Sequence, residues 1–139
     1  SYGGYMTNWV IGHTNRFKEA VCVAGIANTV SMYAQSDINH GDIARWEFKG
    51  VPVINMENFR RASPIEFLKN CKTPTLILHG EADARVPVAQ AWEVYRALED
   101  VGTEVKMVLY PDAGHSIRTP KQFVNVMDNW TNWYRKHLE

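Results

Sequence analysis

The chain has 139 residues, of which 45% are apolar and 22% charged, and these fractions are ordinary for a globular protein with a packed core. Lys and Arg together number 15, as do Asp and Glu, so no net charge favours nucleic acid or an acidic membrane surface as a partner. The longest apolar runs, such as residues 20–27, are far too short to span a bilayer. We therefore expect neither nucleic acid nor a membrane among the partners.

Two cysteines, Cys22 and Cys71, lie in or beside apolar segments and are too few for a disulfide framework. We expect both to be small buried hydrophobic side chains. This cysteine usage favours a reducing compartment such as the cytoplasm. The chain does not begin with the basic residues and apolar stretch that would indicate a signal peptide. Its first residue is not Met, however, so a targeting segment further upstream stays open.

The first half of the chain predicts one long helix, one strand and an irregular segment. Residues 2–14 predict a helix, and residues 19–27 (EAVCVAGIA) predict a buried parallel strand. Residues 28–68, here called the aromatic insertion, hold aromatic side chains among Gly, Pro and Asn, which indicates short helices and loops. Within it, Ser63 and Pro64 predict the start of a short helix with Ser63 as its cap. The aromatic insertion either forms part of a substrate pocket or only anchors a long loop.

The second half predicts two strands, each followed by a helix. Residues 75–79 (TLILH) form an expected central strand, and residues 105–110 a third strand. The helix between them should start at Pro87 and stop at Gly102, with a stripe of Ala91, Val94, Tyr95 and Leu98 at helical spacing. Pro120 should open the last helix, and we interpret its apolar stripe as core packing: Phe123, Val126, Met127, Trp130, Trp133, Tyr134 and Leu138. Strands that alternate with helices predict an α/β fold with a parallel sheet.

An acid and a histidine follow the second and third predicted strands. Asp83 lies in the loop Gly80–Pro87, and His115 lies in the loop that begins at Pro111. Because ligands of parallel sheets sit beyond the carboxyl ends of the strands, the two side chains should meet at one edge. Asp83 would accept the ring N–H of His115, fix its tautomer and stabilise the imidazolium that forms during proton transfer.

The chain opens on the second half of a G-x-S-x-G nucleophile elbow, with Ser1 in the nucleophile position. Gly3 would avoid a clash at the tight turn, and the backbone N–H of Tyr2 would contribute to an oxyanion hole at the start of the helix. Taken singly, Ser1 is a terminal residue, Asp83 a loop carboxylate or helix cap, and His115 a surface histidine in a turn. Their order along the chain, serine then acid then histidine, favours a catalytic triad.

The remaining histidines show no metal-binding pattern. His13 and His137 fall at predicted helix ends, His40 in the aromatic insertion and His79 at the end of a strand. None of them is spaced as in H-x-x-x-H, so we expect no metal, and the proposed chemistry needs no cofactor.

Three segments carry a resemblance to a known family: SYGGYMTNW, LILHGEADARVPVAQ and VLYPDAGH. They resemble the prolyl oligopeptidase family of serine peptidases, and within it the acylaminoacyl-peptidase and dipeptidyl-peptidase branch. The resemblance implies an α/β-hydrolase fold and hydrolysis of short peptides, with Ser1, Asp83 and His115 as nucleophile, acid and base. It also implies that Arg85 binds a substrate carbonyl; from the residues alone, a salt bridge that holds the loop is an equal interpretation.

The same resemblance places residues 1–139 in the C-terminal part of a peptidase catalytic domain, starting at the nucleophile. It implies that the missing N-terminal part of that domain, and a β-propeller in many members, are partners of this chain. We expect the isolated chain to be poorly folded and nearly inactive, because a sheet without its first strands leaves an unpaired edge. Whether the protein forms a homo-oligomer stays open from the sequence.

Three other functions stay open from the sequence. A carboxylesterase could use the same fold, since a fold does not determine its substrate. A non-catalytic scaffold would keep the fold without the chemistry, although an intact triad argues against it. An N-terminal-nucleophile hydrolase would use the amine of Ser1 as its base, against which Asp83 and His115 argue.

Overall fold

The computed structural model describes residues 1–38 and 47–138, so His40 and Trp46 of the aromatic insertion lie outside the described residues. Its centre is a sheet of three parallel strands in the order β1 (Ala20–Val23), β2 (Thr75–Gly80) and β3 (Val105–Tyr110). The register pairs Ala20 with Thr75 and Thr75 with Val105. All three strands therefore end at the same edge of the sheet, and the predicted α/β fold is confirmed.

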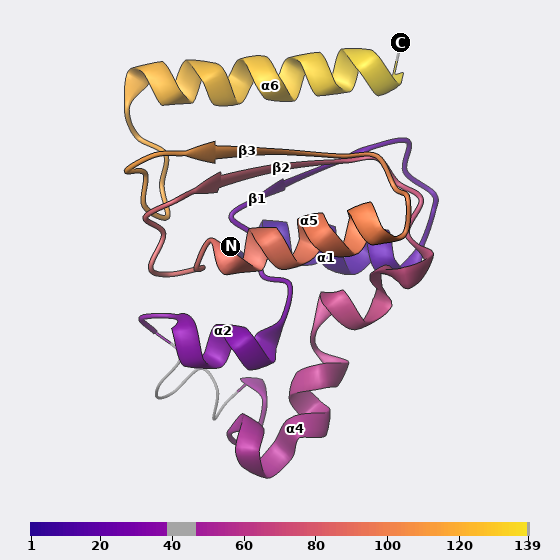
Figure 1. The fold of residues 1–139 in the computed structure, drawn as a ribbon, viewed down its shortest axis with the longest axis vertical. Coiled ribbons are helices and arrows are strands. Elements are labelled where there is room, and N and C mark those ends of the chain that lie inside the picture. Colours follow the sequence, from indigo (N-terminus) through magenta and orange to yellow (C-terminus); the bar gives the residue numbers. More distant parts are fainter. Residues whose placement is uncertain (39–46, 139) are drawn as a thin grey trace.

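Helices cover both faces of this sheet (Figure 1). One face carries α6 (Pro120–Leu138), and the other carries α1 (Tyr2–His13) and α5 (Ala89–Asp100). The short helix η1 (Pro64–Asn70) contacts α1 and α5. Two further helices of the aromatic insertion, α2 (Thr29–Gln35) and α4 (Pro52–Arg61), lie beyond α1 and α5 on that side.

The alternation of side chains along β2 divides the core into two parts. Leu76 and Leu78 pack towards α6 with Val126 and Trp133. Ile77 points to the opposite face and packs with residues of α5 and β1. Every residue of β2 is buried, as the continuous apolar run TLIL predicts for a strand covered on both faces.

Several boundaries differ from those predicted. The strand β1 ends at Val23 because Ala24 takes a positive φ of 47°. The helix α5 begins at Ala89, since a tight turn precedes it, in which the N–H of Gln90 donates to Pro87 O. Ser63 precedes a 3-10 helix without capping it; its hydroxyl donates to the carbonyl of Phe59 instead.

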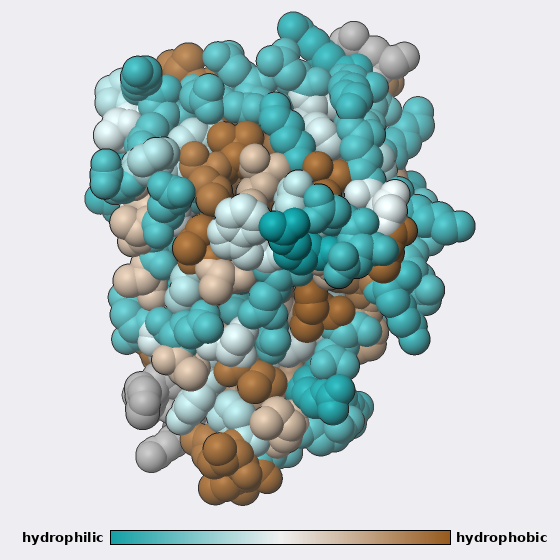
Figure 2. Space-filling view, viewed as in Figure 1, coloured by the Kyte–Doolittle hydropathy of each residue, from teal (hydrophilic) through white to brown (hydrophobic). Residues whose placement is uncertain are grey.

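The interpretation of α6 as core packing along its whole stripe is wrong. Val126 and Trp133 are buried, whereas four of the predicted positions are exposed: Phe123, Met127, Tyr134 and Leu138. A second exposed apolar group belongs to α4 and forms the hydrophobic patch at the bottom of Figure 2; its residues are Val53, Ile54 and Met56. Along the described ranges 1–38 and 47–138, none of the helices has the length and apolar character needed to cross a membrane.

Candidate active site

The acid is built into the loop that follows β2. The side chain of Asp83 has no solvent exposure, and its Oδ1 accepts the backbone N–H groups of Arg85 and Val86, each at 2.9 Å. Two backbone donors on one oxygen stabilise the ionised carboxylate and fix its orientation. The Asp83 side chain therefore stabilises the backbone of its own loop. It does not cap α5, so that alternative interpretation is wrong.

The histidine comes from the loop after β3. His115 Nδ1 lies 2.8 Å from Asp83 Oδ2. A carboxylate only accepts hydrogen bonds, so Nδ1 carries the proton and donates it, which leaves Nε2 as a base. The side chain of His115 is 32% exposed, so Nε2 can reach a group in solution or on a substrate.

Close backbone packing brings these two loops together. Glu81 N–H donates to Tyr110 O and Ala82 N–H donates to Ala113 O, each at 3.0 Å. A β-carbon on Gly80 would lie 2.3 Å from the carbonyl oxygen of Ala113, so only glycine fits there. Asp83 and His115 are thus positioned by main-chain contacts between neighbouring strand ends.

A second histidine, His79, lies beneath the acid loop. From the sequence alone it is only a histidine at the end of a strand, with no predicted role in the site. Its Nε2 donates to Val86 O at 2.7 Å and lies 3.5 Å from Asp83 Oδ2, with no exposure of the side chain. Burial lowers the pKa of His79 from its usual value. The one signal in the sequence is the histidine at the end of a buried strand, four residues before the acid.

Ser1 occupies the N-terminal end of α1 and is exposed, and its carbonyl accepts the N–H of Tyr5 at 2.8 Å. The start of α1 lies against the end of β1, where a β-carbon on Gly4 would fall 2.5 Å from Gly25 Cα and from Val23 O.

These contacts place Ser1 at the same edge of the sheet as Asp83 and His115. Within residues 1–38 and 47–138, no hydrogen bond joins the Ser1 hydroxyl to His115. Catalytic hydrogen bonds are often long without substrate, so this geometry is compatible with a nucleophile and its base. The expected steric need for glycine at position 3 is not seen in the described residues, where a β-carbon on Gly3 meets nothing within 4 Å; the close approach is at Gly4.

The backbone N–H of Tyr2 belongs to the first turn of α1. The first N–H groups of a helix have no intrahelical acceptor, and the helix dipole makes this end attractive to negative charge. The N–H of Tyr2 can therefore donate to an oxyanion that forms beside Ser1.

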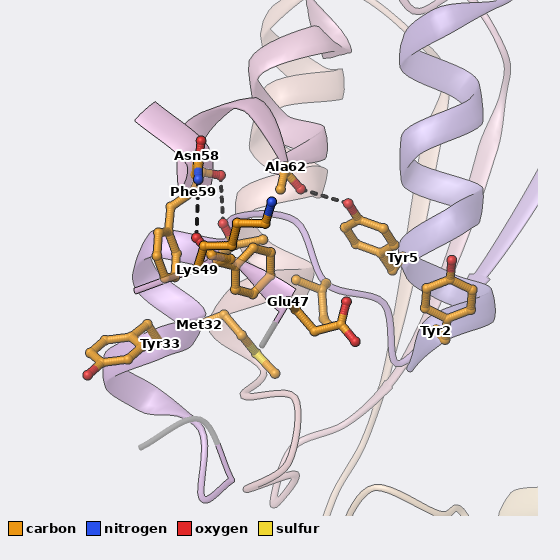
Figure 3. Close-up of a pocket in the computed structure, with 12 residues that line it drawn as sticks. Tyr2, Tyr5, Met32, Tyr33, Glu47, Lys49, Asn58, Phe59 and Ala62 are labelled. Carbon is orange, nitrogen blue, oxygen red and sulfur yellow. Dashed lines mark hydrogen bonds between the residues drawn. The ribbon is translucent and has the colours of Figure 1, made fainter. Parts of the chain in front are cut away.

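A pocket of about 710 Å³ opens beside Tyr2 (Figure 3). The aromatic insertion supplies most of its wall, and α1 supplies Tyr2 and Tyr5, whose hydroxyl donates to Ala62 O at 2.8 Å. The described part of the insertion thus lines an open pocket, in addition to anchoring a loop. The residues that line it are mainly aromatic and aliphatic: Tyr2, Tyr5, Ile26, Thr29, Met32, Tyr33, Glu47, Phe48, Lys49, Asn58, Phe59 and Ala62.

Arg85 forms an ion pair with Asp37, with 2.7 Å between Nε and Oδ1. The backbone supports this contact, because Ser36 donates its hydroxyl to Arg85 O and Asp37 N–H donates to Ala84 O. These bonds join the end of α2 to the acid loop. The salt-bridge interpretation of Arg85 therefore describes the structure without substrate.

In the part of the chain that the structure describes, no group of three or more His, Cys, Asp or Glu is arranged to hold a metal ion.

Comparison with known proteins gives a consistent result. The model of the prolyl oligopeptidase family matches residues 1–139. The uncharacterized peptidase YuxL of Bacillus subtilis is 40% identical, across 99% of this chain and 21% of its own length. Dipeptidyl-peptidase 5 of Porphyromonas gingivalis is 31% identical, across 100% of this chain and 21% of its own.

Solved structures agree with these relatives. The acylaminoacyl peptidase of Pyrococcus horikoshii superposes with a TM-score of 0.87 at 34% identity, covering 99% of this chain and 23% of that one. The three strands and their helices therefore form part of an α/β-hydrolase fold. The chain spans about a fifth of the length of the relatives that it matches.

Proposed function

The chain belongs to the prolyl oligopeptidase family, and we propose that it carries the nucleophile, acid and base of a serine peptidase: Ser1, Asp83 and His115. The 2.8 Å hydrogen bond between Asp83 Oδ2 and His115 Nδ1 supports this most directly. It joins a buried carboxylate to an imidazole that is 32% exposed, and such a pair supports general-base catalysis by the histidine. The peptidases among the similar proteins support the same reaction class.

The mechanism is acyl transfer in two steps. His115 Nε2 takes the hydroxyl proton as Ser1 Oγ attacks the scissile carbonyl, and the N–H of Tyr2 stabilises the oxyanion. The proton then passes to the leaving amine, which departs and leaves an acyl-enzyme. Water, activated by His115, hydrolyses this ester and restores the serine, while Asp83 stabilises the imidazolium in both steps.

The pocket beside Tyr2 supplies the substrate preference. Its aromatic walls suit an apolar side chain on the residue whose carbonyl is attacked. Arg85, two residues beyond the acid, would leave Asp37 in part to bind a carbonyl further along the acyl side. Short peptides with a free or acylated N-terminus fit this arrangement, which corresponds to a dipeptidyl-peptidase or acylaminoacyl-peptidase type of activity.

The outer edge of β1 is expected to bind further strands of the same domain. Among the described residues β1 pairs with β2 alone, and the similar proteins are about five times longer than this chain. We expect those strands to supply the second oxyanion donor, so the 139-residue chain alone should turn over substrate far more slowly than the full-length gene product.

Fluorophosphonate labelling of the full-length gene product tests the proposal, with mass spectrometry to locate the adduct. We expect an adduct on Ser1 that is lost in His115→Ala and retained in His13→Ala, a histidine at the far end of α1. An unlabelled Ser1 in a folded protein would contradict the proposal. Turnover of an N-acylated peptide, compared with that of an aryl ester, then separates peptidase from esterase.

A further inference from the structure

His79 is a buried titratable residue that the proposed mechanism does not use. Its side chain has no exposure, and its Nε2 lies 2.7 Å from Val86 O. A carbonyl oxygen only accepts, so Nε2 carries the proton and donates it. The imidazole thereby joins the end of β2 to Val86, near the far end of the acid loop.

The two contacts of Nε2 differ in strength. The bond to Val86 O at 2.7 Å is short, whereas Asp83 Oδ2 at 3.5 Å is beyond the range of a good hydrogen bond. Val86 is the link between them, because its carbonyl accepts from His79 while its N–H donates to Asp83 Oδ1 at 2.9 Å. Movement of Val86 would therefore move the carboxylate.

We propose that His79 is a positioning residue: its N–H fixes Val86, and Val86 in turn holds Asp83 in hydrogen-bond reach of His115. This inference rests on the proposed function of Asp83 and His115. His79 touches the acid loop and not the substrate, so its effect should fall on catalytic turnover rather than on substrate binding.

The environment of the ring keeps it neutral. Burial lowers the pKa of His79, and its Nδ1 has no hydrogen-bond partner among the described residues, so a second proton would sit on a buried nitrogen without an acceptor. The titratable groups that face it are Asp83 and His115. A neutral donor fixes the loop without competing with His115 for the charge of the carboxylate.

Three variants of the full-length gene product test this inference. His79→Leu removes the donor, His79→Asn shortens it out of reach of Val86 O, and His79→Gln keeps an N–H near the original position. For Leu and Asn we expect kcat to fall about 10²-fold with KM nearly unchanged, because a misplacement of about 1 Å can cost that much. For Gln we expect most of the activity to return.

The pH profile of kcat/KM separates positioning from stability. A loosened Asp83 stabilises the His115 imidazolium less, so the acid limb of the Leu and Asn variants should move to lower pH. Ile77→Ala is the matched control: Ile77 is buried in the same strand but packs towards α5, so this variant should lose thermal stability and keep both kcat and the acid limb.

Inactive Asp83→Asn and His115→Ala variants would support the proposed function. If His79→Leu and His79→Asn then keep the wild-type kcat and acid limb, the inference about His79 fails while the proposed function stands. The inference is also overturned if His79→Gln is as impaired as His79→Asn at equal folded fraction. If Asp83→Asn and His115→Ala both stay active, the proposed function itself fails, and the inference fails with it. If the His79→Leu variant does not fold, the comparison of His79→Asn with His79→Gln tests the inference.

Discussion

Gly80 and Ala113 are in direct backbone contact: a β-carbon on Gly80 would lie 2.3 Å from Ala113 O, and 2.4 Å from the carbonyl oxygen of Gly114. The loops that carry Asp83 and His115 therefore pack main chain against main chain. The absence of a side chain at position 80 allows the loops of Asp83 and His115 to approach this closely.

Gly80→Ala should separate these loops. The new methyl group meets carbonyl oxygens that cannot rotate away, so we expect a loss of about 1–3 kcal/mol in the free energy of unfolding, as for other overpacked sites. The kcat should fall as well, because Asp83 and His115 move apart. Urea unfolding and peptide turnover measure the two effects.

Gly114→Ala is the control for that variant. A β-carbon on Gly114 has Ala82 O as its nearest described neighbour, at 3.9 Å, which is ordinary contact. It should therefore change stability much less than Gly80→Ala does. Equal losses in the two variants would show that the backbone contact at Gly80 does not set the separation of the loops.

Asp83→Asn should lower kcat by about 10⁴-fold, the size known for removal of the charge from a triad acid, with a smaller effect on KM. The amide cannot stabilise the imidazolium of His115, and its NH₂ group can favour the wrong tautomer. Asp112→Asn, in the neighbouring loop, should leave kcat within a few-fold of wild type. A loss below tenfold in Asp83→Asn would remove the acid role.

The sequence was sufficient to predict the sheet and the loops that bear Asp83 and His115. Their strands are short apolar runs, and parallel strands must end at a common edge. His79 was missed because its role depends on contacts with Val86 and Asp83 that the folded loop creates. No spacing rule connects a strand-end histidine to a carbonyl seven residues later.

The periodicity of α6 identified an apolar stripe but not what covers it. Trp133 packs under the helix against the sheet, while Phe123 and Leu138 remain more than half exposed. The pocket was predicted only as an alternative, because its wall depends on how α2 and α4 pack, and their irregular sequence contains no periodic signal.

Cys22 should make the fold sensitive to alkali. Burial raises the pKa of its thiol from 9.0 to about 12, so between these values the unfolded chain loses a proton that the folded chain retains. Stability should therefore fall as pH rises, by roughly 1 kcal/mol per pH unit from this group. The urea midpoint should therefore fall between pH 7.5 and pH 10, and it should fall less in Cys22→Ala than in the wild-type protein. Rapid alkylation of Cys22 in the native protein at pH 8 would contradict its burial.

Gln90→Leu should destabilise the wall of the pocket. The buried Gln90 carbonyl accepts the N–H groups of Ala27 and Asn28, each at 2.9 Å, and its NH₂ group donates to Ser31 at 2.8 Å. Leucine leaves both N–H groups unpaired, at a cost of about 1–3 kcal/mol for each group that stays dry. Since Asn28 caps α2, which lines the pocket, KM should rise.

Gln35→Leu, on the exposed side of α2, is the control for Gln90→Leu. Stability and KM should both stay close to wild type in this variant. Unchanged KM in a destabilised Gln90→Leu would mean that the pocket does not depend on this network.

Arg85 and Asp37 allow the two interpretations of the arginine to be separated. Both side chains are about half exposed, at 46% and 45%, so their ion pair should contribute less than about 1 kcal/mol to stability. If Arg85 binds a substrate carbonyl, Arg85→Met should raise KM for a short peptide, whereas Asp37→Asn frees the guanidinium and should leave KM equal or lower. If Arg85 only holds the loop, both variants remove the same contact and should change KM alike. We expect the first outcome, because Arg85 lies only two residues beyond Asp83 and its backbone N–H donates to the Asp83 carboxylate. The double variant checks it: its KM should match that of Arg85→Met, since Asp37 would act only through Arg85.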